Sequence, residues 1–572
     1  MKKLLTLSLL LFVVLALGTT QAFGTAQITI VNNNAPNVGF NDPTPVAPVG
    51  GNLGTTLGQQ RLNAFNEAAR VWGETLDSPV VIRILASFEP LSCTATAATL
   101  GSAGTISVWR DFTGASLLFP GAEFGSTWYH AALADKLSGI DLDPTSADLR
   151  ARFNINLGNP GCLTGSFWYL GYDTNGPTGT INLVSVLLHE FAHGLGFAQF
   201  ANVSTGALFG GLPDTYNRRI FDNTLQTTWD TMTNAQRVGS AVNPRRVVFL
   251  GDHVTAAVQE VLQEGVPQLQ ITAPAGIAGY YSVGEASFGA QLSATAVTGQ
   301  VVAALDTADA AGPTTFDACS PITNAADVAG KIAIVNRGTC GFVIKAKNVQ
   351  DAGAIAMLVH DNAAGGPPAG MSGVDPTVTI PSVRITLNDG NLIRAQLGAG
   401  VQGSLSVDTS LLAGADPNGK ALLYTPNPVA PGSTISHFDT IDRPNQLMEP
   451  SINSDLTHNV KPPYDMTLPL LRDVGWFPDI DNDGLADGSD ACANSNLTAG
   501  EILIGSCNTT VNNVLFTNGC TIKDYINQAG AGVENHGGWV SNMAHLGEAL
   551  LYGGIITETQ KDAMQSCAAR SK

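Results

Sequence analysis

The stretch "LHEFAHGLGFAQF", residues 188–200, contains the most specific chemical pattern of the chain. Its two histidines, His189 and His193, stand four residues apart around a glutamate. The surrounding segment "LVSVLLHEFAHGLGF" is otherwise apolar, which is typical of a helix that is buried on most sides. On such a helix both imidazoles project from one face and can bind one Zn²⁺, while Glu190 stands beside the metal as a general base. The pattern therefore predicts the metal helix of a zinc hydrolase.

The third zinc ligand is missing from this stretch. A catalytic zinc site needs three protein ligands and one open position. In the metzincin pattern H-E-x-x-H-x-x-G-x-x-H, the third ligand is the final histidine. This chain matches the pattern through Gly196 and then has Gln199, a poor zinc ligand, at the last position. We therefore expect the third ligand to come from another part of the chain.

The sequence ahead of the metal helix favours an α+β catalytic domain. Residues 59–76 carry apolar side chains at helical spacing and run into the β-branched segment "SPVVIRILASF". Two more strand candidates, "GTISVWRDF" and "GSFWYLGYD", precede the metal helix. A long helix, a mixed sheet and a metal helix follow one another in this order in a metzincin catalytic domain, so we predict an α+β, metzincin-like fold by analogy.

Two downstream segments, "SHFDTIDRPNQLMEP" (436–450) and "MTLPLLRDVGWF" (466–477), resemble the leishmanolysin family of metzincins. The shared features are a Ser-His-aromatic triplet, a Leu-Met-x-Pro turn and a helix that ends in Asp-x-Gly-Trp. The resemblance covers the metal helix and residues 433–477 well, and residues 27–180 only loosely.

In the leishmanolysin family the third histidine returns only after an insertion. The resemblance implies that His437 completes the zinc site with His189 and His193, that Glu190 is the catalytic base and that Met448 forms the Met-turn.

The residues alone also favour His437, because it is the one remaining histidine just ahead of a methionine turn. Asp439 is the alternative ligand, since some relatives use a carboxylate there. A gluzincin site, with Glu260 or Glu264 as the last ligand, is a further alternative. The polar context of His458 predicts a surface residue.

About 240 residues separate Gly196 from His437, far more than a loop holds. Within residues 268–411 we predict strands over "GQVVAALDTAD", "GKIAIVNRGTCGF", "AIAMLVHDN" and "TIPSVRITLNDGNLI", and a helix over "FVIKAKNVQDAG". The run "GKIAIVNRGTCGF" followed by "KAKNVQDAGAIAMLVHDN" resembles a protease-associated (PA) domain over about 60 residues.

The PA resemblance implies a non-catalytic lid or substrate-docking surface, with Cys319 joined to Cys340; an inert spacer is the alternative. An inserted domain needs its two ends close together, so that the chain leaves and rejoins the catalytic core without disturbing it. Such an insertion would explain why the third ligand is absent from the metal helix.

The ends and the composition of the chain indicate an exported protein. Residues 1–22 have the lysines, the apolar run and the small residues of a cleaved secretory signal. A net charge of −19 argues against nucleic acid or an anionic membrane surface as a partner. No later segment is apolar for long enough to span a bilayer.

Eight cysteines in an exported chain favour disulfides, and they fall into three groups along the sequence. We predict pairing within the groups, hence Cys93 with Cys162 and Cys319 with Cys340. The connectivity within the last group stays open; its members are Cys492, Cys507, Cys520 and Cys567.

The segment "DIDNDGLADGSD" (479–490) resembles a thrombospondin type-3 repeat. It places aspartates at positions one, three, five, nine and twelve of a calcium loop and Gly484 at position six. The predicted Ca²⁺ ligands are Asp479, Asp481, Asp483, Asp487 and Asp490. An acidic linker is the alternative.

We therefore predict a secreted zinc endopeptidase that acts on a protein or peptide substrate through a Glu-activated, zinc-bound water, with Ca²⁺ as a second ion. A non-catalytic secreted binding protein, acting through the PA domain and the C-terminal module, is the alternative. The expected parts are a signal peptide (1–22), a metzincin-like catalytic domain in two pieces (23–267 and 412–478), an inserted PA domain (268–411), a calcium-binding-like linker (479–492) and a small helical, disulfide-bearing module (493–572).

Overall fold

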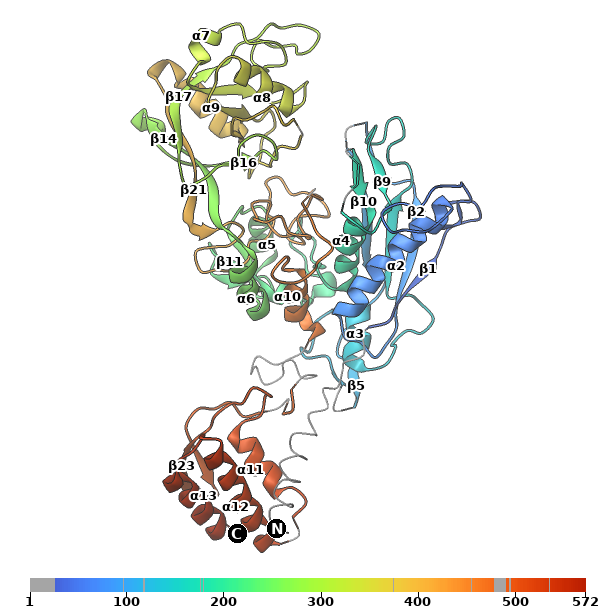
Figure 1. Cartoon of the computed structure of the whole chain (residues 1–572), viewed down its shortest axis with the longest axis vertical. Helices are drawn as coiled ribbons and strands as arrows, with labels where there is room; N and C mark the ends of the chain where they lie inside the picture. Colours follow the sequence, from blue (N-terminus) through green and yellow to red (C-terminus); the bar gives the residue numbers. More distant parts are fainter. Residues whose placement is uncertain are drawn as a thin grey trace. The chain divides into compact units, whose positions relative to one another are not determined.

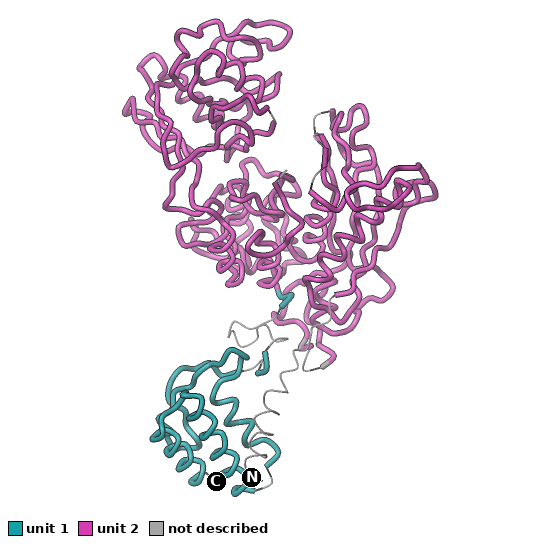
Figure 2. Tube along the Cα trace, viewed as in Figure 1, with its two compact units in different colours: residues 1–24, 475–572 teal, residues 25–474 magenta. Residues whose placement is uncertain are grey.

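The computed structural model describes residues 26–571, apart from 96, 117–118, 175, 178, 374, 454, 478–489, 493–494 and 534. It is an α+β protein, with helices packed on several separate sheets (Figure 1). The chain divides into two compact units, residues 25–474 and residues 1–24 with 475–572 (Figure 2). No helix in the described part of the chain is long and apolar enough to cross a membrane. The predicted signal peptide lies outside the described residues.

A four-stranded mixed sheet supports the metal helix. Its order is β1-β2-β8-β3, with β1 (Ile28–Asn32), β2 (Ile82–Glu89) and β8 (Leu149–Asn154) parallel. The edge strand β3 (Gly101–Thr105) runs antiparallel to β8. Every second residue at the start of β2 is buried, as expected when one face of a sheet is covered by helices.

Two helices, α2 (Leu57–Thr75) and α4 (Leu183–Leu195), pack against each other next to this sheet (Figure 1). The ring of Phe65 on α2 lies 5.0 Å from that of Phe153 and 6.0 Å from that of Phe191, centroid to centroid. The indole Nε1 of Trp72 donates a hydrogen bond of 3.1 Å to the Leu188 carbonyl. Buried aromatic rings each contribute a few kcal/mol through the hydrophobic effect, so this core holds α4 firmly in place.

Smaller elements complete the part of this unit that lies outside the insertion. The short helices are α3 (Ala131–Ser138), α5 (Asn234–Ser240), α6 (Asp252–Val261) and α10 (Thr467–Leu471). The short strands pair as β4 (Val108–Trp109) with β7 (Tyr129–His130), β5 (Thr113–Ser116) with β6 (Phe119–Gly121), and β9 (Phe167–Tyr169) with β10 (Thr180–Asn182). A three-stranded sheet contains β12 (Thr227–Thr228), β11 (Ile220–Asp222) and β13 (Val247–Phe249).

Residues 264–412, called the PA module below, form an eight-stranded sheet. Its order is β15-β14-β21-β17-β18-β19-β20-β16. The strands are β14 (Glu264–Ala273), β15 (Gly279–Ser282), β16 (Gly284–Glu285), β17 (Val297–Ala303), β18 (Ile332–Asn336), β19 (Ala356–His360), β20 (Ser382–Ile385) and β21 (Gln402–Leu412). Its helices are α7 (Ala325–Val328), α8 (Phe342–Asp351) and α9 (Leu387–Ala395). Glu264 pairs with Leu412 at the base of the β14–β21 ribbon, so the two ends of the module are adjacent.

The strand predicted over "TIPSVRITLNDGNLI" is wrong in its second half, which forms helix α9. The Thr386 side chain accepts a hydrogen bond of 3.0 Å from the Asp389 amide and starts the helix as an N-cap. Ile393 is then buried on one face of a helical turn. The local cap decided the structure where the hydrophobic pattern suggested a strand.

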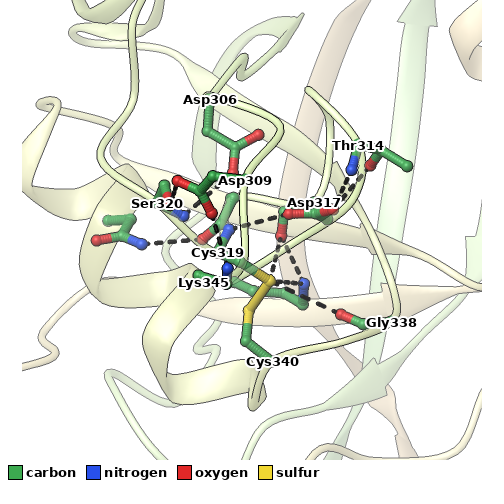
Figure 3. The surroundings of a disulfide bond; sticks show 12 residues. Asp306, Asp309, Thr314, Asp317, Cys319, Ser320, Gly338, Cys340 and Lys345 are labelled. Carbon is green, nitrogen blue, oxygen red and sulfur yellow. Dashed lines mark hydrogen bonds between the residues drawn. A yellow bond between two sulfur atoms is a disulfide. The ribbon is translucent and has the colours of Figure 1, made fainter.

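The disulfide Cys319–Cys340 lies beside a fully buried lysine in the PA module (Figure 3). Lys345 donates to the Asp317 carbonyl oxygen, and its Nζ lies 3.4 Å from Cys319 Sγ. Burial lowers the pKa of Lys345, and the nearby charges of Asp317 and Asp306 partly offset this effect. The lysine therefore joins the loop that holds Asp317 and Cys319 to helix α8, and the disulfide joins it to the segment just ahead of that helix.

The smaller unit, which includes residues 475–572 (teal in Figure 2), contains a hairpin and three helices among its described residues. These elements are β22 (Glu501–Ile504), β23 (Cys507–Asn512), α11 (Ile522–Gly530), α12 (His536–Tyr552) and α13 (Glu558–Arg570). Their core includes Ile522, Met543 and Met564. The structure joins Cys492 to Cys520 and Cys507 to Cys567, a connectivity that the sequence left open. In the larger unit, residues 25–474, it joins Cys93 to Cys162.

Two buried carboxyl groups, Asp135 on α3 and Asp148 ahead of β8, are hydrogen-bonded to each other. Burial raises the pKa of Asp135 to about 7, and the neighbouring charge of Asp148 adds to this rise. Burial also raises the pKa of Asp148. The pair is therefore most stable when it holds a proton.

The contribution of Asp135 to the free energy of unfolding is expected to decrease as the pH rises from about 4 to 8. Because the folded-state pKa of Asp135 lies above the unfolded value of about 3.9, its contribution is complete below pH 4 and is lost as the pH rises through about 7. The loss amounts to about 1.4 kcal/mol for each unit by which the pKa is raised. Asp135→Asn should lack this contribution, so the difference in the free energy of unfolding between wild type and variant should change as the pH rises through about 7. Denaturant unfolding of both proteins at several pH values measures this difference.

Asp143→Asn is the matched control for this prediction. Hydrogen bonds from Thr145 and Ser146 lower the pKa of Asp143, the opposite direction, so its removal should leave the contribution of Asp135 above pH 4 in place. Superimposable profiles for wild type and Asp135→Asn would contradict the role assigned to the buried pair.

Candidate metal centre

Helix α4 carries His189, Glu190 and His193 in the larger unit, residues 25–474. The helix begins at Asn182, whose side chain accepts a hydrogen bond of 3.1 Å from the Ser185 amide. It ends at Gly196, whose φ of 136° lies in the region that favours glycine. All residues of the helix except His193 are buried. The helix is therefore buried on most sides, as its apolar sequence predicted.

His437 joins the two histidines of α4. Its Nε2 lies 3.2 Å from Nε2 of His189, and the same distance separates Nε2 of His193 from Nε2 of His189. Among the described residues, these three histidines are the only group of three or more His, Cys, Asp or Glu side chains that could hold one metal ion. Their ligand atoms all lie within 4.8 Å of one another.

Each of the three rings is held by a backbone carbonyl on its other nitrogen. The Nδ1 atoms of His189, His193 and His437 lie 2.7, 2.8 and 2.9 Å from the carbonyl oxygens of Leu447, Phe197 and Ser433. A carbonyl oxygen only accepts, so each Nδ1 carries the proton and each Nε2 has its lone pair free. The fixed tautomer is the one that a metal ligand needs.

Three lone pairs that face one another at this distance repel unless a cation lies between them. For a tetrahedral zinc with Zn–N bonds of about 2.0–2.1 Å, neighbouring nitrogens are about 3.3 Å apart. The observed separation of 3.2 Å fits that geometry. Burial lowers the pKa of His189 to about 3 and that of His193 to about 4, so both rings are neutral at neutral pH. The donor set therefore fits a zinc ion.

Glu190 lies next to this group with only 8% of its surface exposed. Burial raises its pKa to about 8, and a hydrogen bond with the backbone of Ala103 on β3 partly offsets the rise. Strand β3 passes close to the carboxyl group, since a Cβ on Gly101 would stand 3.0 Å from Glu190 Cγ. A glutamate in these surroundings has a pKa suited to proton transfer near neutral pH.

The chain returns to the metal centre close to the point where it left. The amide of Gln199, at the position of the missing histidine, donates a hydrogen bond of 3.5 Å to the Ser436 hydroxyl. The Tyr216 hydroxyl donates to the carbonyl of Ile435 at 3.0 Å. The residue that departs from the metzincin pattern thus contacts the residue just before His437.

Met448 is fully buried in the turn that follows His437. Its carbonyl accepts a hydrogen bond of 2.9 Å from the Phe438 amide, and the preceding carbonyl, that of Leu447, holds His189. The Leu447 amide in turn donates to the buried carboxylate of Asp465 at 2.6 Å. Sequence reasoning missed Asp465, because an aspartate just ahead of a helix is read as a cap.

The alternative ligands lie outside the histidine group. Asp439 is fully buried, and its Oδ1 accepts a hydrogen bond of 3.2 Å from the Ile441 amide. Glu260 is on α6 and Glu264 at the start of β14, and neither belongs to the group of candidate metal ligands among the described residues. His458, for which we predicted a surface position, is half-buried, with its Nε2 3.2 Å from Asn182 Oδ1 at the start of α4.

The predicted calcium loop is described only at its last position. Asp479, Asp481, Asp483 and Asp487 lie outside the described residues. The Asp490 carboxylate accepts a hydrogen bond of 2.7 Å from the Cys492 amide.

Similar proteins match this chain over short segments. This chain is 39% identical over 74 residues to the minor extracellular protease Vpr of Bacillus subtilis (strain 168). The matched segment makes up 13% of this chain and 9% of that protein. The chain is 40% identical over 86 residues to the ER degradation-enhancing alpha-mannosidase-like protein 3 of Xenopus laevis, 14% of this chain and 9% of that protein. The chain thus spans less than a tenth of the length of these two relatives.

Solved structures show a similarly limited likeness. The zinc aminopeptidase BSAP of Bacillus subtilis aligns with a TM-score of 0.19 and 21% identity, over 27% of this chain and 36% of that one. The aminopeptidase of Aneurinibacillus sp. strain AM-1 aligns with a TM-score of 0.18 and 17% identity, over 34% of this chain and 41% of that one.

The family model described as "PA domain" matches residues 297–393. These residues contain the parallel strands β17, β18, β19 and β20 and the disulfide Cys319–Cys340. The match confirms the PA domain predicted from the motif "GKIAIVNRGTCGF". Residues 297–393 of this chain therefore form a PA domain.

Proposed function

We propose that this chain is a zinc-dependent endopeptidase of the metzincin type, similar to leishmanolysin, with His189, His193 and His437 as zinc ligands and Glu190 as the general base. The observation that carries the proposal is the convergence of three neutral imidazoles, in which the free Nε2 atoms of His193 and His437 each lie 3.2 Å from that of His189. Three protein ligands leave the fourth tetrahedral position open, as catalytic zinc sites require.

Zinc, when bound, polarises the carbonyl oxygen of a substrate and makes water more acidic. The chain's own residues perform the proton transfers. The Glu190 carboxylate accepts the proton of the attacking water and then donates it to the nitrogen of the leaving amine. The carbonyls of Leu447, Phe197 and Ser433 keep the three rings in one tautomer and orientation throughout.

The edge strand β3 supports an extended peptide as the substrate. Strand β3 is the last strand of its sheet and pairs on one side with β8 in the described structure. A peptide can add to such an edge through backbone hydrogen bonds, independently of its sequence. Because β3 also contacts Glu190, a peptide on this edge would pass beside the general base. A peptide that extends along such an edge on both sides of the general base is cleaved within its chain and not only at a terminus.

The disulfides fit an oxidising compartment outside the cytosol. We therefore propose that the enzyme is secreted and acts on extracellular proteins or peptides.

Metal content and cleavage products together test this proposal. We expect about one zinc ion per chain after gentle purification. We also expect cleavage of a peptide with both termini blocked, loss of this activity with a zinc chelator and recovery on adding zinc. A protein that contains no zinc, or peptide cleavage that a zinc chelator leaves unchanged, would refute the proposal. If the protein only releases single residues from free amino termini, it is an aminopeptidase and the proposed endopeptidase activity is wrong.

A further inference from the structure

We infer that the PA module is part of the scaffold of the metal centre. Residues 424–443, called the third-ligand segment below, present His437 and are attached to the PA module on both sides of this histidine. In this role the PA module positions His437, and the affinity of the site for zinc should depend on the contacts between the PA module and the third-ligand segment. The inference rests on the zinc site of the proposed function.

The first attachment joins Gly366 of the PA module to Asn427. The Gly366 amide donates to the Asn427 carbonyl at 2.7 Å, and the Asn427 amide donates to the Gly366 carbonyl at 2.5 Å. The neighbouring Gly365 has a φ of +132°, and a Cβ there would overlap the Asn427 carbonyl oxygen and stand 2.9 Å from Pro428 Cδ. Only glycine therefore permits this close antiparallel contact.

The second attachment lies at the other end of the segment, at Arg443. Its guanidinium forms an ion pair with Glu285 on β16. Its carbonyl accepts a hydrogen bond of 2.7 Å from the Gln263 amide, and its amide donates to the Ala413 carbonyl at 3.3 Å. Gln263 and Ala413 directly flank the PA module, so Arg443 is bound at the base of the β14–β21 ribbon.

Between the two attachments the segment is closed into a loop that includes His437. The Tyr424 amide donates to the His437 carbonyl at 2.9 Å, and the Ile435 amide donates to the Tyr424 carbonyl at 2.8 Å. The Ser433 carbonyl, six residues beyond Asn427, accepts from Nδ1 of His437. A shift of Asn427 would therefore move the group that orients the third imidazole.

The attachments lower the cost of ordering this loop when the metal binds. A free loop would lose conformational entropy on zinc binding, whereas a loop already fixed at both ends loses little. Outer-shell contacts of metal ligands commonly change metal affinity by 10–100-fold. The long insertion separates His437 from the other two ligands in the sequence, and its contacts hold His437 in place at the metal centre.

Gly365→Ala in the full chain tests the inference, with Gly373→Ala as its matched control. Both glycines lie in the PA domain at positive φ, but a Cβ on Gly373 would overlap Val343 within the PA domain. We expect Gly365→Ala to weaken zinc binding by about 10–100-fold, measured by competition with a chelating dye. Its activity should recover at higher free zinc, and the absorption of its Co²⁺ form should change. Gly373→Ala should keep the wild-type zinc affinity at a comparable loss of thermal stability.

Glu285→Gln provides a second variant that keeps the backbone intact, so that misfolding of Gly365→Ala does not decide the test. It should weaken zinc binding a few-fold in the same direction. If wild type binds zinc while Gly365→Ala and Glu285→Gln bind it as tightly, the scaffold role is overturned and the zinc site stands. If wild type binds no zinc, the proposed function itself is wrong.

Discussion

Glu190→Gln is expected to lower kcat by about 10²–10⁴-fold, the contribution usual for general acid–base catalysis. Glutamine has nearly the same shape but cannot accept and return a proton. The side chain is 8% exposed and stands beside the ligand group without belonging to it, so zinc binding should persist. The measurement is kcat on a doubly blocked peptide, together with the zinc content of the same preparation.

Glu260→Gln is the control for this variant, because Glu260 is an exposed glutamate on α6 in the same unit. It should retain both zinc and kcat. A fully active Glu190→Gln enzyme would reject the proposed base. Loss of zinc together with activity would instead show that the carboxylate is needed to build the site.

His437→Ala is expected to reduce zinc affinity by more than the 10–100-fold typical of outer-shell changes, and to abolish detectable cleavage. The substitution leaves two protein ligands where a catalytic zinc needs three. It also leaves the Ser433 carbonyl without its partner on the imidazole. Chelator competition measures the affinity, and the doubly blocked peptide reports the activity.

His545→Ala is the matched control, since His545 is exposed on α12 in the other compact unit. It should behave as wild type in both measurements. Tight zinc binding by His437→Ala would mean that the third ligand lies elsewhere. Asp439, the alternative carboxylate two residues further on, would then be replaced by asparagine as the next test.

The features that could be predicted from sequence are those encoded within a few residues. Helical spacing of apolar residues around His189, Glu190 and His193 defines a buried metal helix, because a residue and its neighbour four positions on share one face. The PA domain is recognisable for the same reason, since its motif is contiguous. Where a cap competed with the hydrophobic pattern, as at Thr386, the local prediction was wrong.

The metal centre as a whole depends on contacts between distant parts of the chain. The Leu447, Phe197 and Ser433 carbonyls that set the tautomers have no sequence signature, because every residue carries a carbonyl. The disulfide connectivity of the C-terminal unit likewise needed the folded positions of its four cysteines.

The sequence by itself determined the buried helix that carries His189, Glu190 and His193 and the inserted PA domain, because short-range periodicity and contiguous motifs encode them. Only the tertiary structure decided that Ser436 returns to Gln199, which brings His437 to the other two imidazoles. It also decided that the PA module is attached on both sides of His437. The physical reason is that contacts between residues far apart in the sequence depend on the packing of whole units. No local pattern specifies which distant backbone groups come together.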